Sequence, residues 1–303
     1  MRPGDLTTLA NVKLWNNTDA YKSSGVGSDF VLSQLITRWS QSILAYLERP
    51  WILPRTYTNE AYDGNDNPSQ YLRNWPVISI SDVYINGQLI PPLPILQSAV
   101  PGMIPPNSSM YGFGYRFETD DGIPPGGPQA IKLIGTRFYR GKQNIQFTYT
   151  AGYQVTGEPW EIPDVMSPST VSVVTTNQPY GIWASDASVV EAITGVVFTP
   201  TNGSPPSATN TYSVVNPDPE PPGIYNFYPG DAGRNILISY GYIPSALEQV
   251  TIELVLERFR YRDRIGEVSR TLGGGQVTAK YDTSGFPTYV LDTLQRFRMI
   301  LAI

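Results

Sequence analysis

The residues that could do chemistry in this chain are carboxylates, amides and glycines, because its 303 residues include no cysteine and no histidine. This composition excludes thiol catalysis, disulfides, Cys/His zinc sites and any triad that uses an imidazole. Carboxylate chemistry stays open. Asp120–Asp121 and the pair Glu158 and Glu161 are of the residue type that a glycosidase needs. Nothing in the sequence brings either pair together, and acidic surface loops are the simpler interpretation.

Two further motifs begin like ligand sites and then depart from them. Asp63–Asn67 starts like a calcium loop, but Pro68 replaces the required Gly and Asn74 stands where the bidentate Glu belongs. Gly273–Gly275 lacks the Gly-Lys-Ser/Thr ending of a phosphate-binding loop. We interpret the first motif as a turn and the second as a flexible hinge. The sequence therefore predicts no metal, no cofactor and no catalytic residue.

Three aromatic residues in the middle of the chain have two interpretations. Trp160, Trp183 and Tyr180 could stack against sugars or could fill the core of a small β-domain. We favour the core.

The N-terminal region predicts two helices. Thr7 or Thr8 can cap the first, in which Leu9, Val12 and Trp15 follow at helical spacing. Ser28 and Asp29 can start the second, which Arg49–Pro50 ends. One apolar stripe runs along the second helix: Leu32, Leu35, Ile36, Trp39, Ile43, Tyr46 and Leu47.

Strand patterns follow these helices. Residues 55–62 suit a pleated surface, 63–65 predict a turn, and 70–75 return as the second strand of a pair. A third strand is expected over 77–85, with a bulge where the alternation slips at Ser81–Asp82. Asn86–Gly87 favours a tight hairpin, because both residues tolerate positive φ.

Several runs in this order resemble a known family. TTLANVKLW, YLERPW, RTYTNEAYDG and LRNWPVISISDVYINGQ, and later FTYTAGYQV and SALEQVTIELVLERFRYRDRIGEVS, are similar to the adaptor proteins of tailed bacteriophages. These are also called head–tail connector or head-completion proteins. The resemblance covers roughly residues 5–90, 131–155 and 241–303, and its weight lies in the order of several short matches.

The middle of the chain departs from a minimal adaptor. Residues 91–130 are rich in Pro and Gly and predict a long surface loop. The string N-I-x-x-x-Y occurs at residues 144–149, in an expected strand over 144–153, and again at residues 235–240. We infer an inserted all-β unit over 156–240 whose last strand repeats the one it interrupts. Its strands are expected at about 170–176, 181–184, 189–198, 211–215, 223–228 and 234–242.

The C-terminal part returns to helix. Ser245 can cap a helix so apolar that more than one neighbour must bury it. Its end carries four arginines that could meet acids of an adjacent subunit: Arg258, Arg260, Arg262 and Arg264. Residues 276–282 look extended.

A last helix is expected from Pro287 or Thr288, and it either folds back on its own subunit or reaches a neighbour or the portal protein. The resemblance favours the portal, and we expect a chain ended at Gly285 to keep its fold and lose portal binding. The candidate binding residues are Tyr281, Phe286, Pro287, Tyr289, Val290, Leu294, Phe297 and Leu301.

These patterns predict an α+β fold with a small α-helical core, an antiparallel β-sheet and an inserted all-β, sandwich-like domain. Residues 1–155 and 241–303 would form the adaptor core, 156–240 the insert, and 266–303 a flexible C-terminal arm with the terminal helix. Met1–Asp5 lacks the apolar stretch of a signal peptide, and no run is long enough to span a membrane.

The resemblance implies a structural virion protein with no enzymatic activity. Identical copies, twelve in the family's usual ring, would join the portal protein to the tail or to the next neck protein. The ring would be assembled in the host cytoplasm and lie in the neck of the virion. DNA would pass through its lumen without sequence-specific binding. The net charge of −5 argues against a duplex-binding surface and so agrees with this expectation.

Two alternatives remain. One is another neck ring, a stopper or tail-completion protein, and the other is a tail-associated glycan-binding β-module. A carboxylate hydrolase is a more distant possibility.

Overall fold

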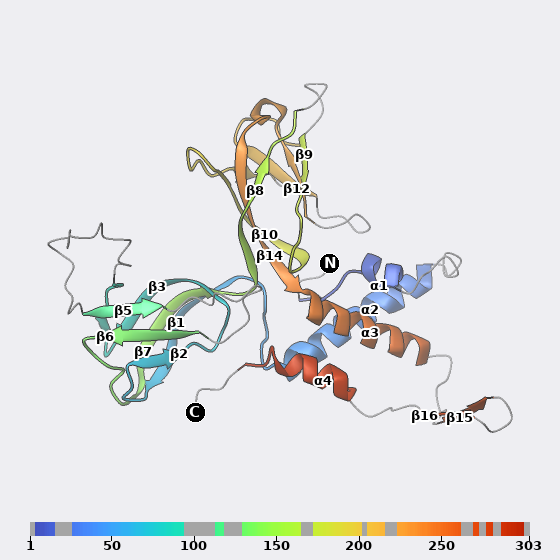
Figure 1. Cartoon of the computed structure of the whole chain (residues 1–303), viewed down its shortest axis with the longest axis horizontal. Coiled ribbons are helices and arrows are strands. Elements are labelled where there is room, and N and C mark those ends of the chain that lie inside the picture. Colours follow the sequence, from blue (N-terminus) through green and yellow to red (C-terminus); the bar gives the residue numbers. More distant parts are fainter. Residues whose placement is uncertain are drawn as a thin grey trace, which may run out of the picture. The chain divides into compact units, whose positions relative to one another are not determined.

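The computed structural model describes residues 4–15, 26–93, 113–117, 129–164, 172–201, 205–215, 223–261, 269–272, 277–280 and 286–299. Helices and largely antiparallel sheets confirm the predicted α+β class (Figure 1). The chain divides into two compact units, one of residues 1–51 and 154–298 and the other of residues 52–153 and 299–303. That residues 156–240 form an inserted domain stays a prediction.

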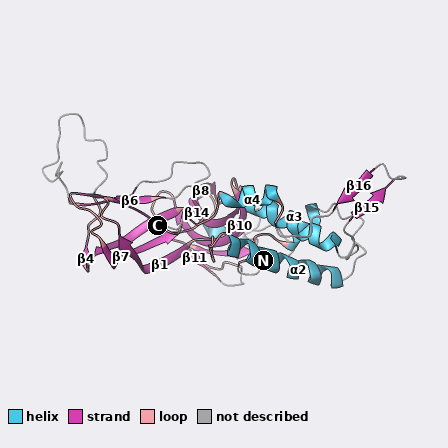
Figure 2. Cartoon of the chain, turned by 90° about the horizontal axis from the view of Figure 1, so that it is seen from below, coloured by secondary structure: helices cyan, strands magenta, loops and turns pink. Residues whose placement is uncertain are grey.

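The helices belong to the first of these units and pack on one another (Figure 2). They are α1 (Leu9–Trp15), α2 (Val26–Tyr46), α3 (Ser245–Tyr261) and α4 (Thr288–Gln295). The apolar stripe expected on the second helix is confirmed, although α2 begins at Val26 and not at Ser28. The shared core of α1, α2 and α3 consists of Val12, Leu32, Ile36, Ile252, Val255, Leu256 and Phe259.

Residues 55–151, here called the first module, form two sheets. The strands are β1 (Arg55–Gly64), β2 (Ser69–Tyr71), β3 (Val77–Ile85), β4 (Gln88–Leu89), β5 (Gly114–Phe117), β6 (Ala130–Ile134) and β7 (Gly141–Ala151). One sheet has the order β1-β7-β3-β4 and the other the order β2-β6-β5. Apolar side chains from both sheets, such as Phe147 and Ile131, join in one buried core.

The local turns of the first module were predicted better than its strand partners. The register slips between Ile80 and Asp82, which confirms the bulge, and Asn86 (φ 51°) and Gly87 (φ 78°) form the β3–β4 turn. The expected pairing of β1 with the next strand is wrong: β1 pairs with β7, and β2 pairs with β6. Side-chain alternation identifies a strand but carries no information about which distant strand in the sequence is its partner. The loop predicted over 91–130 also contains β5.

Residues 154–244, here called the second module, again form two sheets. The strands are β8 (Gln154–Glu161), β9 (Ser172–Thr175), β10 (Gly181–Glu191), β11 (Thr199–Pro200), β12 (Thr211–Val215), β13 (Ile224–Phe227) and β14 (Asn235–Pro244). Their orders are β10-β14-β8 and β11-β12-β13-β9. Only β11 and β12, among the strands described in the two modules, pair in parallel.

Two strand predictions for the second module were wrong. The expected strand at 181–184 and the first residues of the one expected at 189–198 belong to a single strand, β10, and residues 192–198 lie outside it. Its alternation is interrupted by register shifts after Trp183 and after Asp186. β8 was not predicted, and it contains Gly157 and Pro159, residue types that are uncommon inside strands. β8 lies at the edge of its sheet, where a proline removes no ladder hydrogen bond that the sheet needs.

The described part of the C-terminal region adds a hairpin and α4. β15 (Ser269–Leu272) pairs antiparallel with β16 (Val277–Lys280). β16 agrees with the extended segment expected at 276–282, whereas β15 was not predicted. No helix in the described ranges is long and apolar enough to cross a membrane.

Candidate interaction site

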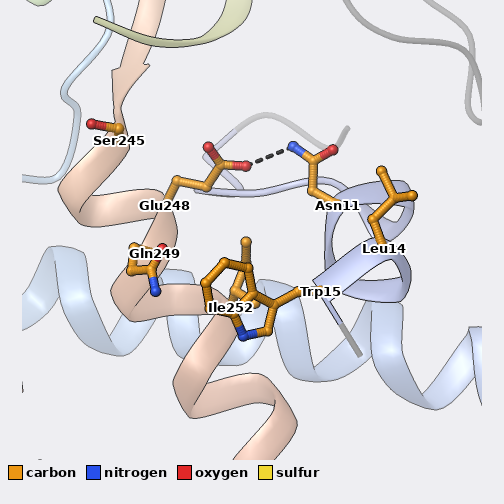
Figure 3. Close-up of a pocket in the computed structure, with 7 residues that line it drawn as sticks. All are labelled: Asn11, Leu14, Trp15, Ser245, Glu248, Gln249 and Ile252. Atoms are coloured by element: carbon orange, nitrogen blue, oxygen red, sulfur yellow. Dashed lines mark hydrogen bonds between the residues drawn. The ribbon is translucent and has the colours of Figure 1, made fainter. Parts of the chain in front are cut away.

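A pocket of about 390 Å³ lies between α1 and α3, in the unit that contains the helices (Figure 3). One side is apolar, formed by the last turn of α1 and by α3, and the other is lined by hydroxyl, amide and carboxyl groups. The lining residues are Asn11, Leu14, Trp15, Ser245, Glu248, Gln249 and Ile252.

Hydrogen bonds and one ion pair fix α1 beside the pocket. The hydroxyl of Thr8 accepts a hydrogen bond from the backbone N–H of Asn11 at 3.1 Å, as the sequence predicted for a capping residue. Lys13 forms an ion pair with Asp29 of α2 at 2.5 Å. With Val12 fully buried, these contacts set which face of the short helix is exposed.

The exposed face of α1 is apolar. The side chain of Leu14 is 78% exposed and that of Trp15 is 55% exposed. On α2, Phe30 is 60% exposed as well. Leu14 and Trp15 line the pocket, and large exposed apolar side chains of this kind mark a surface suited to contact with another chain.

Glu248 gives the pocket its one carboxylate. Its Oε1 accepts a hydrogen bond from Asn11 Nδ2 at 2.6 Å (Figure 3). The same oxygen accepts a second hydrogen bond from Thr7 Oγ1 at 3.3 Å. Burial raises the pKa of Glu248, and the two hydrogen bonds oppose that rise in part. The carboxylate therefore ties the start of α3 to α1 and leaves the apolar side of the pocket open.

Several of the predicted portal-binding residues that the structure describes pack against other parts of the same chain. The ring of Phe286 lies 5.8 Å from Trp39 and 5.6 Å from Tyr46, both on α2. Val290 and Leu294 are fully buried, whereas Tyr289 is exposed.

The connections at the end of α4 also run to its own chain. Arg49 donates a hydrogen bond to the backbone oxygen of Phe297, and Arg298 pairs with Glu48. Pro287 precedes α4 and is half-buried. Tyr281 and Leu301 lie outside the described residues. In the described residues the terminal helix lies against its own chain, and the expected effect of ending the chain at Gly285 stays a prediction.

The predicted inter-subunit arginines are described only in part. Arg258 is exposed and its guanidinium lies 5.0 Å from the ring centre of Tyr261. Arg260 is exposed too, and Arg262 and Arg264 lie outside the described residues. Their proposed contact with a neighbour stays a prediction.

Of the carboxylates considered for hydrolysis, Glu161 is exposed at the end of β8 and Glu158 has structural partners. Glu158 accepts hydrogen bonds from Trp160 Nε1, from the backbone N–H of Asn177 and from the hydroxyl of Tyr240, at 2.8, 2.8 and 2.6 Å. Asp120 and Asp121 lie outside the described residues. Trp183 is buried and donates to the hydroxyl of Tyr225, so its interpretation as a core residue is confirmed.

The turn that begins like a calcium loop is closed by its own hydrogen bonds. Asn65 Oδ1 accepts from the backbone N–H of Asn67, and Asp63 Oδ1 accepts from that of Gln143. Within the described ranges no three residues of the types His, Cys, Asp and Glu gather as metal ligands would.

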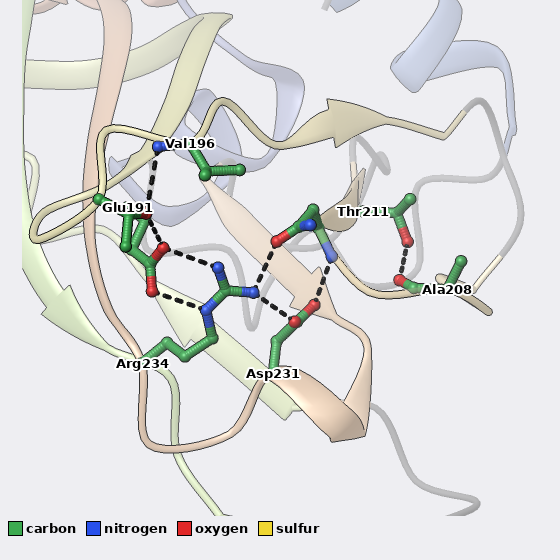
Figure 4. Close-up of polar contacts among 8 residues, drawn as sticks. Glu191, Val196, Ala208, Thr211, Asp231 and Arg234 are labelled. Carbon is green, nitrogen blue, oxygen red and sulfur yellow. Dashed lines mark hydrogen bonds and ion pairs between the residues drawn. The ribbon is translucent and has the colours of Figure 1, made fainter.

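A second polar cluster lies in the second module, around Arg234 (Figure 4). Its guanidinium contacts Glu191 at 2.8 Å, Asp231 at 2.6 Å and Asn210 at 2.6 Å. The hydrogen bond from Arg234 is the main reason why the pKa of Glu191 falls to about 2. The cluster connects the ends of β10 and β14 to the segment before β12, which is a structural task.

Sequence reasoning did not find the pocket. Trp15 and Glu248 were seen as members of two helices, but no pattern in the sequence indicates that α1 and α3, more than 200 residues apart, lie together. No protein-family model matches the chain, and a comparison with curated proteins gives no match.

Proposed function

We propose that this protein is a structural component of a tailed-phage neck, which forms a ring between the portal protein and the tail. The observation that carries the proposal is the exposed apolar face of α1 with its adjoining pocket. When each copy contacts the next through two different surfaces, the copies close into a ring if the rotation from one copy to the next divides evenly into a full turn. The order of sequence runs that resembles phage adaptors supports the same function.

The ring would work through binding and geometry. Interface cores are enriched in aromatic and other large apolar side chains, and a few of them carry most of the binding free energy. Trp15, Leu14 and Phe30 are suited to that role because they are large and exposed. The lumen would conduct DNA through backbone contacts that do not read sequence.

The test is the assembly state of the purified protein, alone and mixed with its portal protein. We expect light scattering after size exclusion to give a closed oligomer, and negative-stain electron microscopy to show rings seated on the portal. A protein that stays monomeric at every concentration, with and without portal, contradicts the proposal. Binding to an adaptor but not to the portal would assign it to the stopper class instead.

The glycan-binding alternative is weaker. It needs aromatic faces open to a sugar, but Trp183 is buried and Tyr180 lies 5.8 Å from Tyr242, half-buried. A glycan array with the intact protein would still detect it.

A further inference from the structure

We infer that the two modules are two copies of one seven-stranded unit in tandem. Six strands of each module pair in the same way, whereas β4 pairs with β3 and β11 pairs with β12. In the sheet that holds the longest strands, β7 lies between β1 and β3, and β14 lies between β8 and β10. In the other sheet β6 lies between β2 and β5, and β13 lies between β9 and β12. The recurrence that the sequence showed for one strand therefore extends over these six strands.

The registers agree around the first bulge, although β1 has a second shift between Tyr62 and Gly64 that β8 lacks. In the first module Tyr57 faces Tyr149 and Glu60 faces Phe147, so two residues of β1 oppose one of β7. In the second, Val155 faces Tyr240 and Glu158 faces Ile238, with the same two-to-one bulge.

The pairing on the other side of the central strands, β7 and β14, repeats as well. β3 shifts register between Val77 and Ser79 and again between Ile80 and Asp82. β10 has its two shifts at the matching places, which are Trp183/Ser185 and Asp186/Ser188.

The hydrogen bonds at the first bulge repeat with different residues. Asn59 (φ 51°) donates its backbone N–H to Thr148 Oγ1 at 3.2 Å. Gly157 (φ 67°) donates to Ser239 Oγ at 3.1 Å. Both bulge residues have the left-handed backbone that Gly and Asn adopt at least cost.

The parallel pairing in the second sheet has a counterpart too. Pro200 pairs in parallel with Tyr212 in the second module, and Pro92 forms a parallel bridge with Tyr115 in the first. Two unrelated modules of the same fold class would not be expected to share both bulged registers and the parallel contact. We therefore infer that one module arose by duplication of the other.

The modules also differ in the length of one exposed turn. β3 and β4 are joined by Asn86–Gly87, whereas the matching turn of the second module has four residues, Ala192–Gly195. Glu191 donates its N–H to the oxygen of Val196, which shows where that longer turn closes.

The longer turn and the segment after it expose apolar side chains. Ile193 in the turn is 80% exposed, and Val197, which forms a bridge with Val190 after the turn, is 63% exposed. The first module closes the same hairpin with two polar turn residues, so a shorter turn suffices. An apolar tip on one surface and an apolar pocket on another are the two complementary parts of a contact between unlike surfaces.

We propose that this tip inserts into the α1–α3 pocket of a neighbouring copy. The occupant is a second copy of this chain, because tip and pocket occur on the same polypeptide and the charge of the tip is already matched within it: Glu191, at its base, is paired with Arg234. Ile193 and Val197 would then meet Leu14, Trp15 and Ile252 across the interface. This contact rests on the proposed ring and names one of its interfaces.

One full-length variant tests both inferences. Replacing Ala192–Gly195 by Asn-Gly gives the second module the turn of the first. If the modules are copies, the melting temperature stays within a few degrees of wild type. A control with Val-Thr in place of Asn-Gly has the same length but no residue suited to positive φ, and it should melt lower. A short-turn variant no more stable than this control contradicts the duplication.

The same variant reports on the contact. We expect self-association at least tenfold weaker than wild type, with the fold retained. A folded short-turn variant that still forms rings overturns the contact and leaves the ring function standing. A wild-type protein that never forms rings overturns the function itself.

Cysteine pairing gives an independent measurement, because the chain has no natural cysteine. Ile193→Cys and Leu14→Cys are prepared separately, mixed and oxidised. We expect a disulfide-linked pair that needs both variants and is absent when Leu14→Cys is replaced by Tyr71→Cys, an exposed position in β2. Equal cross-linking with both partners contradicts the contact.

Discussion

The hydroxyl of Tyr240 in β14 donates a hydrogen bond to a carboxylate oxygen of Glu158 in β8, at 2.6 Å. In the first module Tyr149 donates to Glu60 at 2.5 Å from the matching position. Burial raises the pKa of both tyrosines, so each hydroxyl keeps its proton and remains a donor. The pair closes the bulge in each module.

The first prediction concerns these two hydroxyls. Tyr240→Phe and Tyr149→Phe should each lower the free energy of unfolding by about 1.5 to 3 kcal/mol, the usual worth of a hydrogen bond to a charged group. Chemical denaturation measures the change, and Tyr71→Phe, at an exposed tyrosine, is the control. A loss in only one module would show that the two pairs are not equivalent.

The second prediction concerns the bulge residue of β8. Gly157→Val should destabilise the protein by about 1 to 3 kcal/mol, because a β-branched residue is strained at positive φ. Gly157→Asn should cost much less, since Asn59 already occupies the matching position with φ 51°. Thermal melts compare the two variants, and an equal loss for both would refute the backbone explanation.

The third prediction concerns acid stability. The pKa of Glu191 lies at about 2 in the folded chain against 4.5 for an ordinary glutamate, chiefly because Arg234 donates a hydrogen bond to it. Between these values the unfolded state binds more protons, so stability rises with pH and is lost as pH falls through the window. Glu191→Gln should flatten this part of the profile. The measurement is the difference in unfolding free energy between the two proteins from pH 5 to pH 2, and parallel curves would contradict it.

The fourth prediction concerns α4. Leu294 is fully buried against its own chain, so Leu294→Ala should cost about 2 to 5 kcal/mol. Ending the chain at Gly285 removes Val290 and Leu294 together and should lower the melting temperature further. Tyr289→Ala, at an exposed position of α4, should leave stability unchanged while testing portal binding. Full stability after truncation would mean that α4 is dispensable for the fold.

The sequence predicted what local chemistry determines. The stripe of α2, the cap at Thr8, the bulge near Asp82 and the Asn86–Gly87 turn follow from spacing and backbone preference over a few residues. Partners distant in sequence could not be read, since any alternating strand can pair with any other. The pairing of β1 with β7 and the pocket between α1 and α3 are of that kind.

The duplication could be predicted from the sequence only in part. One recurring string was visible because Ile145 and Ile236, and Tyr149 and Tyr240, keep their types at buried positions of the two central strands. Elsewhere the copies keep backbone geometry with different side chains, as Asn59 and Gly157 show. Residue identity alone could not reveal a repeat that is preserved in hydrogen bonds.

Pro159 lies in the edge strand β8 and has no backbone N–H to offer. A strand from another molecule that approached this edge would find an interrupted row of donors, and sheet growth from chain to chain would stop there. Crowded copies are thus steered away from fibrils and toward assemblies of finite size.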